Sequence, residues 1–217
     1  MAVQNIYRKR IRTQIMVAKV FDDLLLKGIR SGQMPARTQE ARTWYREQAA
    51  KVSKSAADGT KLIKEMGVDR YETRFRLGNM YTYRYDPKHK ATLPYYDSFP
   101  LIFPINKAKG GFLGINLHYL PPVLRAKLMD ALYDTANNKN YTEATKLKLN
   151  YDILSGAAKF NMFKPTVKHY LMAHVVTKFV YIQPTEWDIA LFLPSQKFVG
   201  ATKAQVWKDS RAIIKGK

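Results

Sequence analysis

The four histidines are the first candidates for chemistry in this sequence, and they do not form a recognisable catalytic or metal-binding pattern. They are His89, His118, His169 and His174. His169 and His174 are five residues apart, a spacing that puts two side chains on different faces of a helix and on opposite faces of a strand. The chain has no cysteine, which excludes disulfides, thiolate metal sites and cysteine nucleophiles. We therefore expect no metal site and no cofactor.

The carboxylates were considered as a metal-dependent nuclease site, which needs two or three of them around a hydrated cation. The candidates are Asp86, Asp97, Glu186 and Asp188. Their proline and tryptophan neighbours are typical of turns, in which an aspartate bonds the backbone. A small nuclease is therefore kept only as a third hypothesis.

The common phosphate-loop and serine-nucleophile motifs are not found. Residues 107–111 read Lys-Ala-Lys-Gly-Gly and lack the hydroxyl residue that holds magnesium in a phosphate loop, so the glycines predict a hairpin turn. No Gly-x-Ser-x-Gly motif occurs, and neither Ser155 nor Ser195 has an obvious base partner in the sequence. We expect no catalytic residues and no enzymatic activity.

The net charge is the strongest functional indication in the sequence. The 217 residues carry 37 Lys+Arg and 17 Asp+Glu, a formal charge of +20. Residues 1–76 contribute +9, residues 77–123 contribute +3 and residues 124–217 contribute +8, so the charge is not confined to one tail. With 46% hydrophobic and 12% aromatic residues the chain should fold. Such a charge favours a polyanionic partner, either nucleic acid or an acidic protein or membrane surface.

A membrane partner is not expected, because the apolar stretch 11–26 is interrupted by Arg12, Lys19, Asp22 and Asp23. Basic residues near the N-terminus could instead follow a phosphate backbone without reading bases. The alternative is that they belong to solvated helix faces. The predicted nucleic-acid-binding residues are Arg8, Lys9, Arg10, Arg12, Arg37, Arg42, Arg46, Lys51 and Lys54.

Aromatic residues could add base stacking to these phosphate contacts. The candidates are Trp44, Tyr45, Tyr81, Tyr83, Tyr85, Tyr95 and Tyr96. For most of them packing in the core is the favoured interpretation.

The elements that would position these residues begin with helices. Apolar residues recur at helical spacing over 7–30 and over 38–54, where Thr38 is a suitable N-cap. A short helix is expected over 60–66. Pro121 and Pro122 suit the first turn of a helix that ends near Thr135, and a helix capped by Thr142 follows. Helical structure is also predicted over 166–178, and a helix or basic tail over 203–214.

The middle of the chain favours strands. Residues 80–85 are rich in aromatics, 99–105 form an extended segment whose prolines suggest an edge or irregular strand, and 112–119 form a third strand. A later strand is predicted near 189–193, after a short turn at 185–188. The fold class is therefore α+β, with a small antiparallel sheet or partly open barrel over about 78–120 flanked by basic helices. We expect a basic helical region over 1–76 and an α+β core over 77–217.

Several passages of this sequence are similar to those of a known family. Residues 41–46, Ala-Arg-Thr-Trp-Tyr-Arg, resemble an Ala-Arg-x-Trp-Phe-Arg helix, and further likeness lies in 78–88, 93–101 and 111–121. The sequence resembles DNA end protector or virion structural proteins of T-even-like contractile-tailed bacteriophages. The likeness covers roughly residues 40–135 and is weaker near 186–188.

This resemblance implies a virion protein, assembled in the host cytoplasm, that lies near the packaged DNA end, the portal or the tail. It brings no catalytic residues. The expected partners are double-stranded DNA, bound without sequence specificity, and other portal, neck or tail proteins, with several copies arranged in a ring. The first hypothesis is a non-enzymatic protein that guards the DNA end. The alternative is a purely structural neck or baseplate component whose basic surface meets acidic virion proteins.

Overall fold

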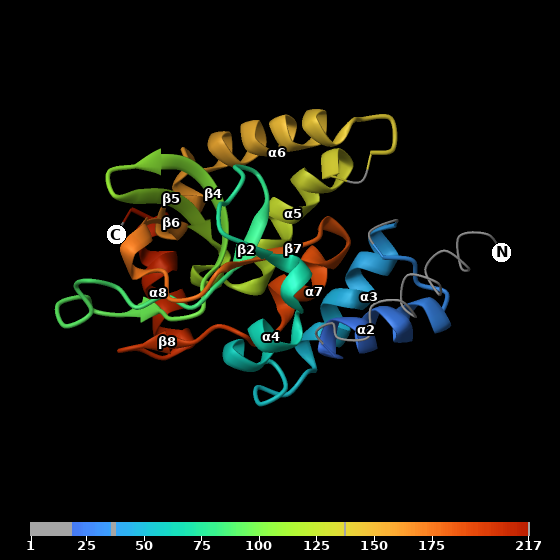
Figure 1. The fold of residues 1–217 in the computed structure, drawn as a ribbon, viewed down its shortest axis with the longest axis horizontal. Coiled ribbons are helices and arrows are strands. Elements are labelled where there is room, and N and C mark those ends of the chain that lie inside the picture. The colour runs from blue at the N-terminus through green and yellow to red at the C-terminus, as the bar shows by residue number, and fades with distance from the viewer. Residues whose placement is uncertain (1–18, 36–37, 137, 217) are drawn as a thin grey trace.

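Antiparallel strands form an open six-stranded sheet in the order β1-β7-β2-β4-β5-β6 (Figure 1). The computed structural model describes residues 19–35, 38–136 and 138–216. β3 and β8 pair separately as a short second sheet. The strands are β1 (Tyr71–Glu72), β2 (Met80–Thr82), β3 (Tyr96–Asp97), β4 (Leu101–Ala108), β5 (Gly111–Asn116), β6 (Val167–Leu171), β7 (Phe179–Ile182) and β8 (Phe198–Val199).

Helices pack against one face of the larger sheet, which confirms the α+β class; the sheet does not close into a barrel. Figure 1 shows α2 and α3 at the end of the molecule opposite the β4–β5 hairpin. The helices are α2 (Lys19–Arg30), α3 (Gln39–Ala50), α4 (Gly59–Glu65), α5 (Pro122–Ala136), α6 (Glu143–Ala157), α7 (Trp187–Phe192) and α8 (Lys203–Ile214). Short 3₁₀ helices lie at Val68–Arg70, Leu117–Tyr119, Asn161–Thr166, Met172–His174 and Pro184–Glu186.

Two apolar clusters occupy the two faces of the sheet. Along β2 and β4 the side chains alternate, so Met80 and Leu101 belong to the larger cluster while Tyr81 and Ile102 belong to the smaller one. The helices cover the larger cluster. The smaller cluster is mainly aromatic and consists of Tyr81, Tyr83, Tyr85, Ile102, Phe112, Tyr170 and Phe179.

Local sequence signals correctly predicted several helix ends. The Thr38 hydroxyl accepts a hydrogen bond from the Ala41 amide, and the Thr142 hydroxyl accepts one from the Thr145 amide, as N-caps do. α5 begins at Pro122, and the C-terminal helix is formed as α8. The predicted helix over 7–30 is confirmed from Lys19 onward, and its first part lies outside the described residues.

Three predicted segments are corrected by the structure. Of the two alternatives predicted for residues 99–105, the edge strand is wrong, because β4 pairs on both sides, whereas the irregular strand is confirmed: its ladder shifts register between Pro104 and Asn106, a bulge that accommodates a residue without an amide hydrogen. Residues 167–171 form β6 instead of a helix, because each of them pairs with a residue of β5. Residues 189–193 lie mainly in helix α7, not in a strand.

α7 was mistaken for a strand because it is buried on several sides. Its residues Trp187 to Leu191 are all buried, so no polar face marks helical periodicity. α7 packs against α3, and Phe21 of α2 and Tyr45 of α3 belong to the same cluster as Leu191. The proposed division of the chain at residue 76 stays a prediction.

Candidate nucleic-acid interface

The nine basic residues predicted to contact nucleic acid are found in different environments. Lys51 and Lys54 are exposed just after α3. Arg8, Lys9, Arg10, Arg12 and Arg37 lie outside the described residues. Contact of these seven residues with DNA remains a prediction.

The expectation that Arg42 and Arg46 lie on an exposed face of α3 is corrected by their burial. Only 2% of the Arg42 side chain is exposed. Arg42 Nε donates to Asp188 Oδ2 at 3.0 Å, and Arg46 Nε donates to Asp188 Oδ1 at 2.6 Å. Asp130 Oδ1 lies 3.0 Å from Arg42 Nη2 and 2.9 Å from Arg46 Nη2. The two guanidiniums therefore join α3 to α7 and α5.

The charge state of this cluster is set by its carboxylates. Burial alone would lower the pKa of Arg46, but Asp188 and Asp130 raise it above its ordinary value. Arg42 also lies over the ring of Tyr133, 4.2 Å from its centre. Arg46 thus stays cationic, and both arginines have an internal structural role.

A second buried ion pair joins Arg70 to Glu186 in two parallel hydrogen bonds of 2.6 and 2.9 Å. Asp22 of α2 lies close enough for both charges to affect its pKa. Burial raises the pKa of Asp22 from 3.8 to about 6; Arg70 acts to lower it and Glu186 to raise it.

We predict that Asp22→Asn stabilises the protein at pH 7 by about 1–2 kcal/mol. Because the folded pKa lies above the unfolded value, the folded state binds more protons between about pH 4 and pH 6. The free energy of unfolding of the wild-type protein therefore falls as pH rises through that window. Asp22→Asn should not show the part of this fall that comes from Asp22. Urea unfolding at several pH values measures the difference, with Asp152→Asn, at an exposed position of α6, as the control. An unchanged pH dependence in Asp22→Asn would show that Asp22 is not perturbed.

A polar network inside the protein includes a serine, a histidine and an aspartate. Ser195 Oγ lies 3.3 Å from His118 Nε2, and His118 Nδ1 lies 2.7 Å from Asp97 Oδ2. Burial lowers the pKa of His118, so its neutral ring donates to Asp97 and accepts from Ser195. Burial acts to raise the pKa of Asp97, but His118 and hydrogen bonds from Asn116 and the Phe99 amide lower it. The prediction that Ser195 has no base partner is thus corrected.

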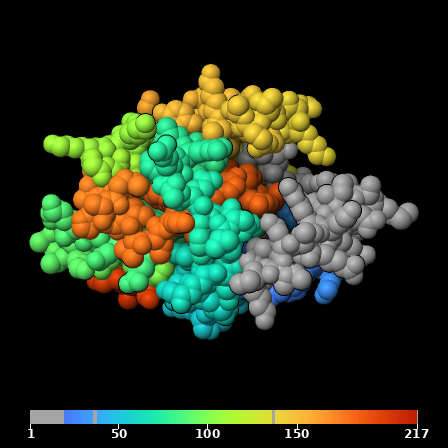
Figure 2. All heavy atoms as spheres, viewed as in Figure 1, coloured from blue at the N-terminus to red at the C-terminus, as the bar shows by residue number. Residues whose placement is uncertain are grey.

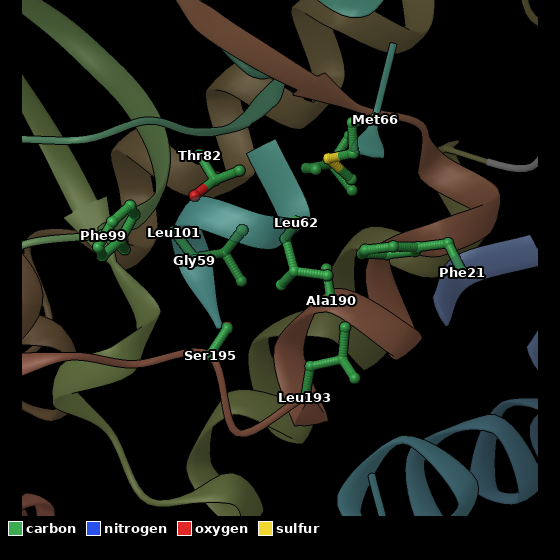
Figure 3. A pocket seen from close by; sticks show the side chains of 11 residues that line it. Phe21, Gly59, Leu62, Met66, Thr82, Phe99, Leu101, Ala190, Leu193 and Ser195 are labelled. Atoms are coloured by element: carbon green, nitrogen blue, oxygen red, sulfur yellow. The ribbon is translucent and has the colours of Figure 1, made fainter. Parts of the chain in front are cut away.

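The cavity beside Ser195 is small and mostly apolar. Figure 3 shows Phe21, Leu62 and Leu193 among the side chains that line it. Its volume of about 20 Å³ is close to that of a single water site. We therefore assign the Ser195–His118–Asp97 network to positioning the segment after α7, since this cavity has no room for a substrate.

A larger cavity is lined in part by Asp97, and we call it the tyrosine cavity. Its volume is about 440 Å³, within the range of small-ligand sites. Tyr95 and Tyr96 are partly exposed on its wall, whereas Tyr119 and Tyr170 are buried. It is lined by Tyr85, Pro87, Lys88, His89, Leu93, Tyr95, Tyr96, Asp97, Tyr119, Lys168, His169, Tyr170 and Leu171.

Lys168 is the partly buried cation of the tyrosine cavity. Its ammonium lies over the ring of Tyr119, 4.2 Å from the ring centre. Burial lowers the pKa of Lys168. Within residues 19–35, 38–136 and 138–216, no carboxylate forms an ion pair with it. An anionic ligand would supply the missing counter-charge.

Sequence reasoning missed Lys168 and the role of Asp97. Lys168 was assigned to a helix, and its neighbours in the cavity come from a loop some eighty residues earlier. Tyr85, Tyr95 and Tyr96 had been considered for stacking, with core packing favoured. No local signal brings these segments together, because the contacts that join them, such as the bond from the Leu171 amide to the Tyr85 hydroxyl, link residues far apart in the sequence.

The described residues also bear on two other kinds of site, a metal centre and a membrane span. The described part of the chain contains no group of three or more His, Asp or Glu side chains that could hold a metal ion. Among those same residues, no helix is both long and apolar enough to cross a membrane.

The fold and its surface define a basic α+β protein with exposed cations around an aromatic cavity. The model of the family described as phage T4 terminal DNA protecting protein matches residues 7–211. The chain belongs to this family, which confirms the resemblance to bacteriophage DNA end protectors. No curated protein and no solved structure matches it. Family membership supports a role in protecting phage DNA ends, and the family is that of a DNA-protecting protein and not a known enzyme class.

Proposed function

We propose that this chain is a non-enzymatic virion protein that binds the ends of packaged duplex DNA without sequence specificity and blocks access to them. The family match over residues 7–211 carries this proposal. The formal charge of +20 supplies the electrostatic attraction that phosphate binding needs.

The proposal places the protein at the portal, neck or tail, where the DNA end meets other virion proteins. Several copies in a ring would surround a single duplex. The non-enzymatic part is supported by the small volume beside Ser195, about 20 Å³, which leaves the Ser195–His118–Asp97 network without a substrate site in that cavity.

Binding to a short linear duplex is predicted to weaken steeply with salt. If six phosphates are neutralised, a plot of log K against log salt concentration should have a slope of roughly −5. Fluorescence anisotropy at several salt concentrations gives this slope. Absent or salt-insensitive binding would contradict the proposal and would favour the purely structural component that meets acidic virion proteins.

The same assay tests Lys51 and Lys54, the two predicted contacts that are exposed in the structure. The double variant Lys51→Glu/Lys54→Glu should weaken binding and make the slope less negative by about two phosphate contacts. Lys148→Glu/Lys159→Glu changes the net charge equally, at exposed positions in and just after α6. Equal losses of DNA affinity in the two double variants would show that net charge, and not contact with Lys51 and Lys54, sets the affinity.

A further inference from the structure

The tyrosine cavity combines aromatic walls with cations. Tyr85, Tyr95, Tyr96, Tyr119 and Tyr170 supply the rings, and the ring centres of Tyr95 and Tyr119 are 6.1 Å apart. Lys88, His89, Lys168 and His169 supply the nitrogen groups. A ligand that fits both features has a flat ring and an anionic group, which is the chemistry of a nucleotide.

Among the described residues, Asp97 is the carboxylate that lines the tyrosine cavity, and its oxygens already accept hydrogen bonds from protein groups. Asp97 Oδ2 accepts from His118 Nδ1 and Asn116 Nδ2, and Oδ1 accepts from the amides of Phe99 and Lys197. Those donors stabilise the ionised form of Asp97, so the attraction for an anion comes from Lys88 and Lys168 in the same cavity. Lys168 has no such carboxylate partner among the described residues. The cavity is therefore suited to a negatively charged ligand.

The position of the tyrosine cavity is suited to binding the end of a DNA strand. It opens between β6, an edge strand of the larger sheet, and the loop after Tyr85. Figure 2 shows the green atoms of this loop beside the orange atoms of the β6 region at one end of the molecule. The Met172 amide donates to the Gly110 carbonyl at 2.9 Å, so the hairpin with exposed Lys107 and Lys109 lies next to this region. Phosphates of an adjoining duplex could contact these lysines.

We propose that the tyrosine cavity holds the terminal nucleotide of one DNA strand, with its base among the tyrosines and its phosphate at Lys168. This inference rests on the proposed function. A cavity of about 440 Å³ admits one nucleotide but not a duplex. A terminal base pair stacks on one side only, so its nucleotide is extracted more easily than an internal one. The cavity thereby distinguishes an end from the interior of DNA without reading sequence.

Photocrosslinking with the full-length wild-type protein tests this placement directly. One linear duplex carries 5-iodouracil at its terminal nucleotide, and a matched duplex carries it ten base pairs from either end. The terminal probe should crosslink to peptides containing residues 85–96 or 168–171, at a yield at least fivefold above that of the internal probe. Equal yields, or crosslinks mapped only to other segments, would overturn the inference.

A substitution then separates end capture from general DNA binding. Lys168→Met keeps the aliphatic stem and removes the charge, and Lys148→Met is the exposed control on α6. Lys168→Met should weaken binding to an open-ended duplex about tenfold and leave binding to a covalently closed circle of the same sequence unchanged. Circular dichroism melting checks that both variants are folded.

The outcomes distinguish this inference from the proposed function. If the wild-type protein prefers open ends but Lys168→Met retains that preference in full, the cavity assignment is wrong and end protection still stands. If the wild-type protein binds closed circles as tightly as open duplexes, or binds neither, both the proposed function and the cavity assignment fail. Occupation by an acidic segment of a partner protein would give end preference without a crosslink to the cavity.

Discussion

Replacing Asp188 with alanine is expected to lower the free energy of unfolding by about 3–5 kcal/mol, because it leaves two buried guanidiniums with only one partly exposed carboxylate. Arg42 and Arg46 both donate to Asp188 at 3.0 and 2.6 Å. Asp130 is 46% exposed and cannot fully replace it. For a chain of this length the loss corresponds to a fall in Tm of roughly 6–20 °C. Urea unfolding followed by tryptophan fluorescence measures the effect.

The matched control is Asp130→Ala, the more exposed carboxylate of the same cluster. This substitution should lower the free energy of unfolding by about 1 kcal/mol or less, because surface ion pairs are weak. The same logic predicts that charge reversal at Arg42 or Arg46 impairs DNA binding only by unfolding the protein. A stably folded Arg42→Glu variant with selectively weakened DNA binding would contradict the structural role assigned to that residue.

Arg125→Met is expected to destabilise the protein by about 3 kcal/mol, because it removes the donors for buried backbone carbonyls. Arg125 donates to the carbonyls of Leu120 at 2.7 Å, Leu191 at 2.6 Å and His118 at 3.3 Å. It thereby connects the start of α5 with α7. The His118 carbonyl keeps a second donor, Trp207 Nε1. Most of the destabilisation therefore comes from the carbonyls of Leu120 and Leu191, which lose the Arg125 donor.

Thermal unfolding should show this loss as a fall in Tm of roughly 6–12 °C. Lys127→Met is a control of similar chain length on the same helix, at an exposed position. A Tm for Arg125→Met equal to that of the control would mean that the carbonyls find other partners and that Arg125 does not secure the α5–α7 contact.

Features coded by neighbouring residues were predicted well. Thr38 and Thr142 cap their helices through hydrogen bonds that span three residues, and Pro122 starts α5, so a short stretch of sequence contains the whole cause. The same holds for the hairpin turn between β4 and β5, where Gly110 has a φ of +69°.

Features that depend on distant partners could not be predicted. Arg42 resembles an exposed helix arginine until Asp188, which lies 146 residues later, is placed beside it. α7 resembles a strand because its burial hides the helical period, and β6 becomes a strand through pairing with β5. These tertiary contacts override local propensity.

The candidate site likewise combines a feature that the sequence could predict with features that depend on contacts between distant residues. Composition indicated a polyanionic partner, and the family match now shows that the chain belongs to the phage terminal DNA protecting family, which supports DNA as that partner. The basic residues predicted in and just after α3 are not equivalent, since Arg42 and Arg46 are buried whereas Lys51 and Lys54 are exposed. The tyrosine cavity, assembled from residues 85–97, 119 and 168–171, could not be inferred before those segments were placed together.

Protection of DNA ends from digestion tests the central claim most directly. A linear duplex is incubated with the protein and treated in parallel with an exonuclease, which needs an end, and with an endonuclease, which cuts internally. The account predicts strong protection against the exonuclease and little against the endonuclease at the same protein concentration. Equal protection against both enzymes, or none against the exonuclease, would contradict it.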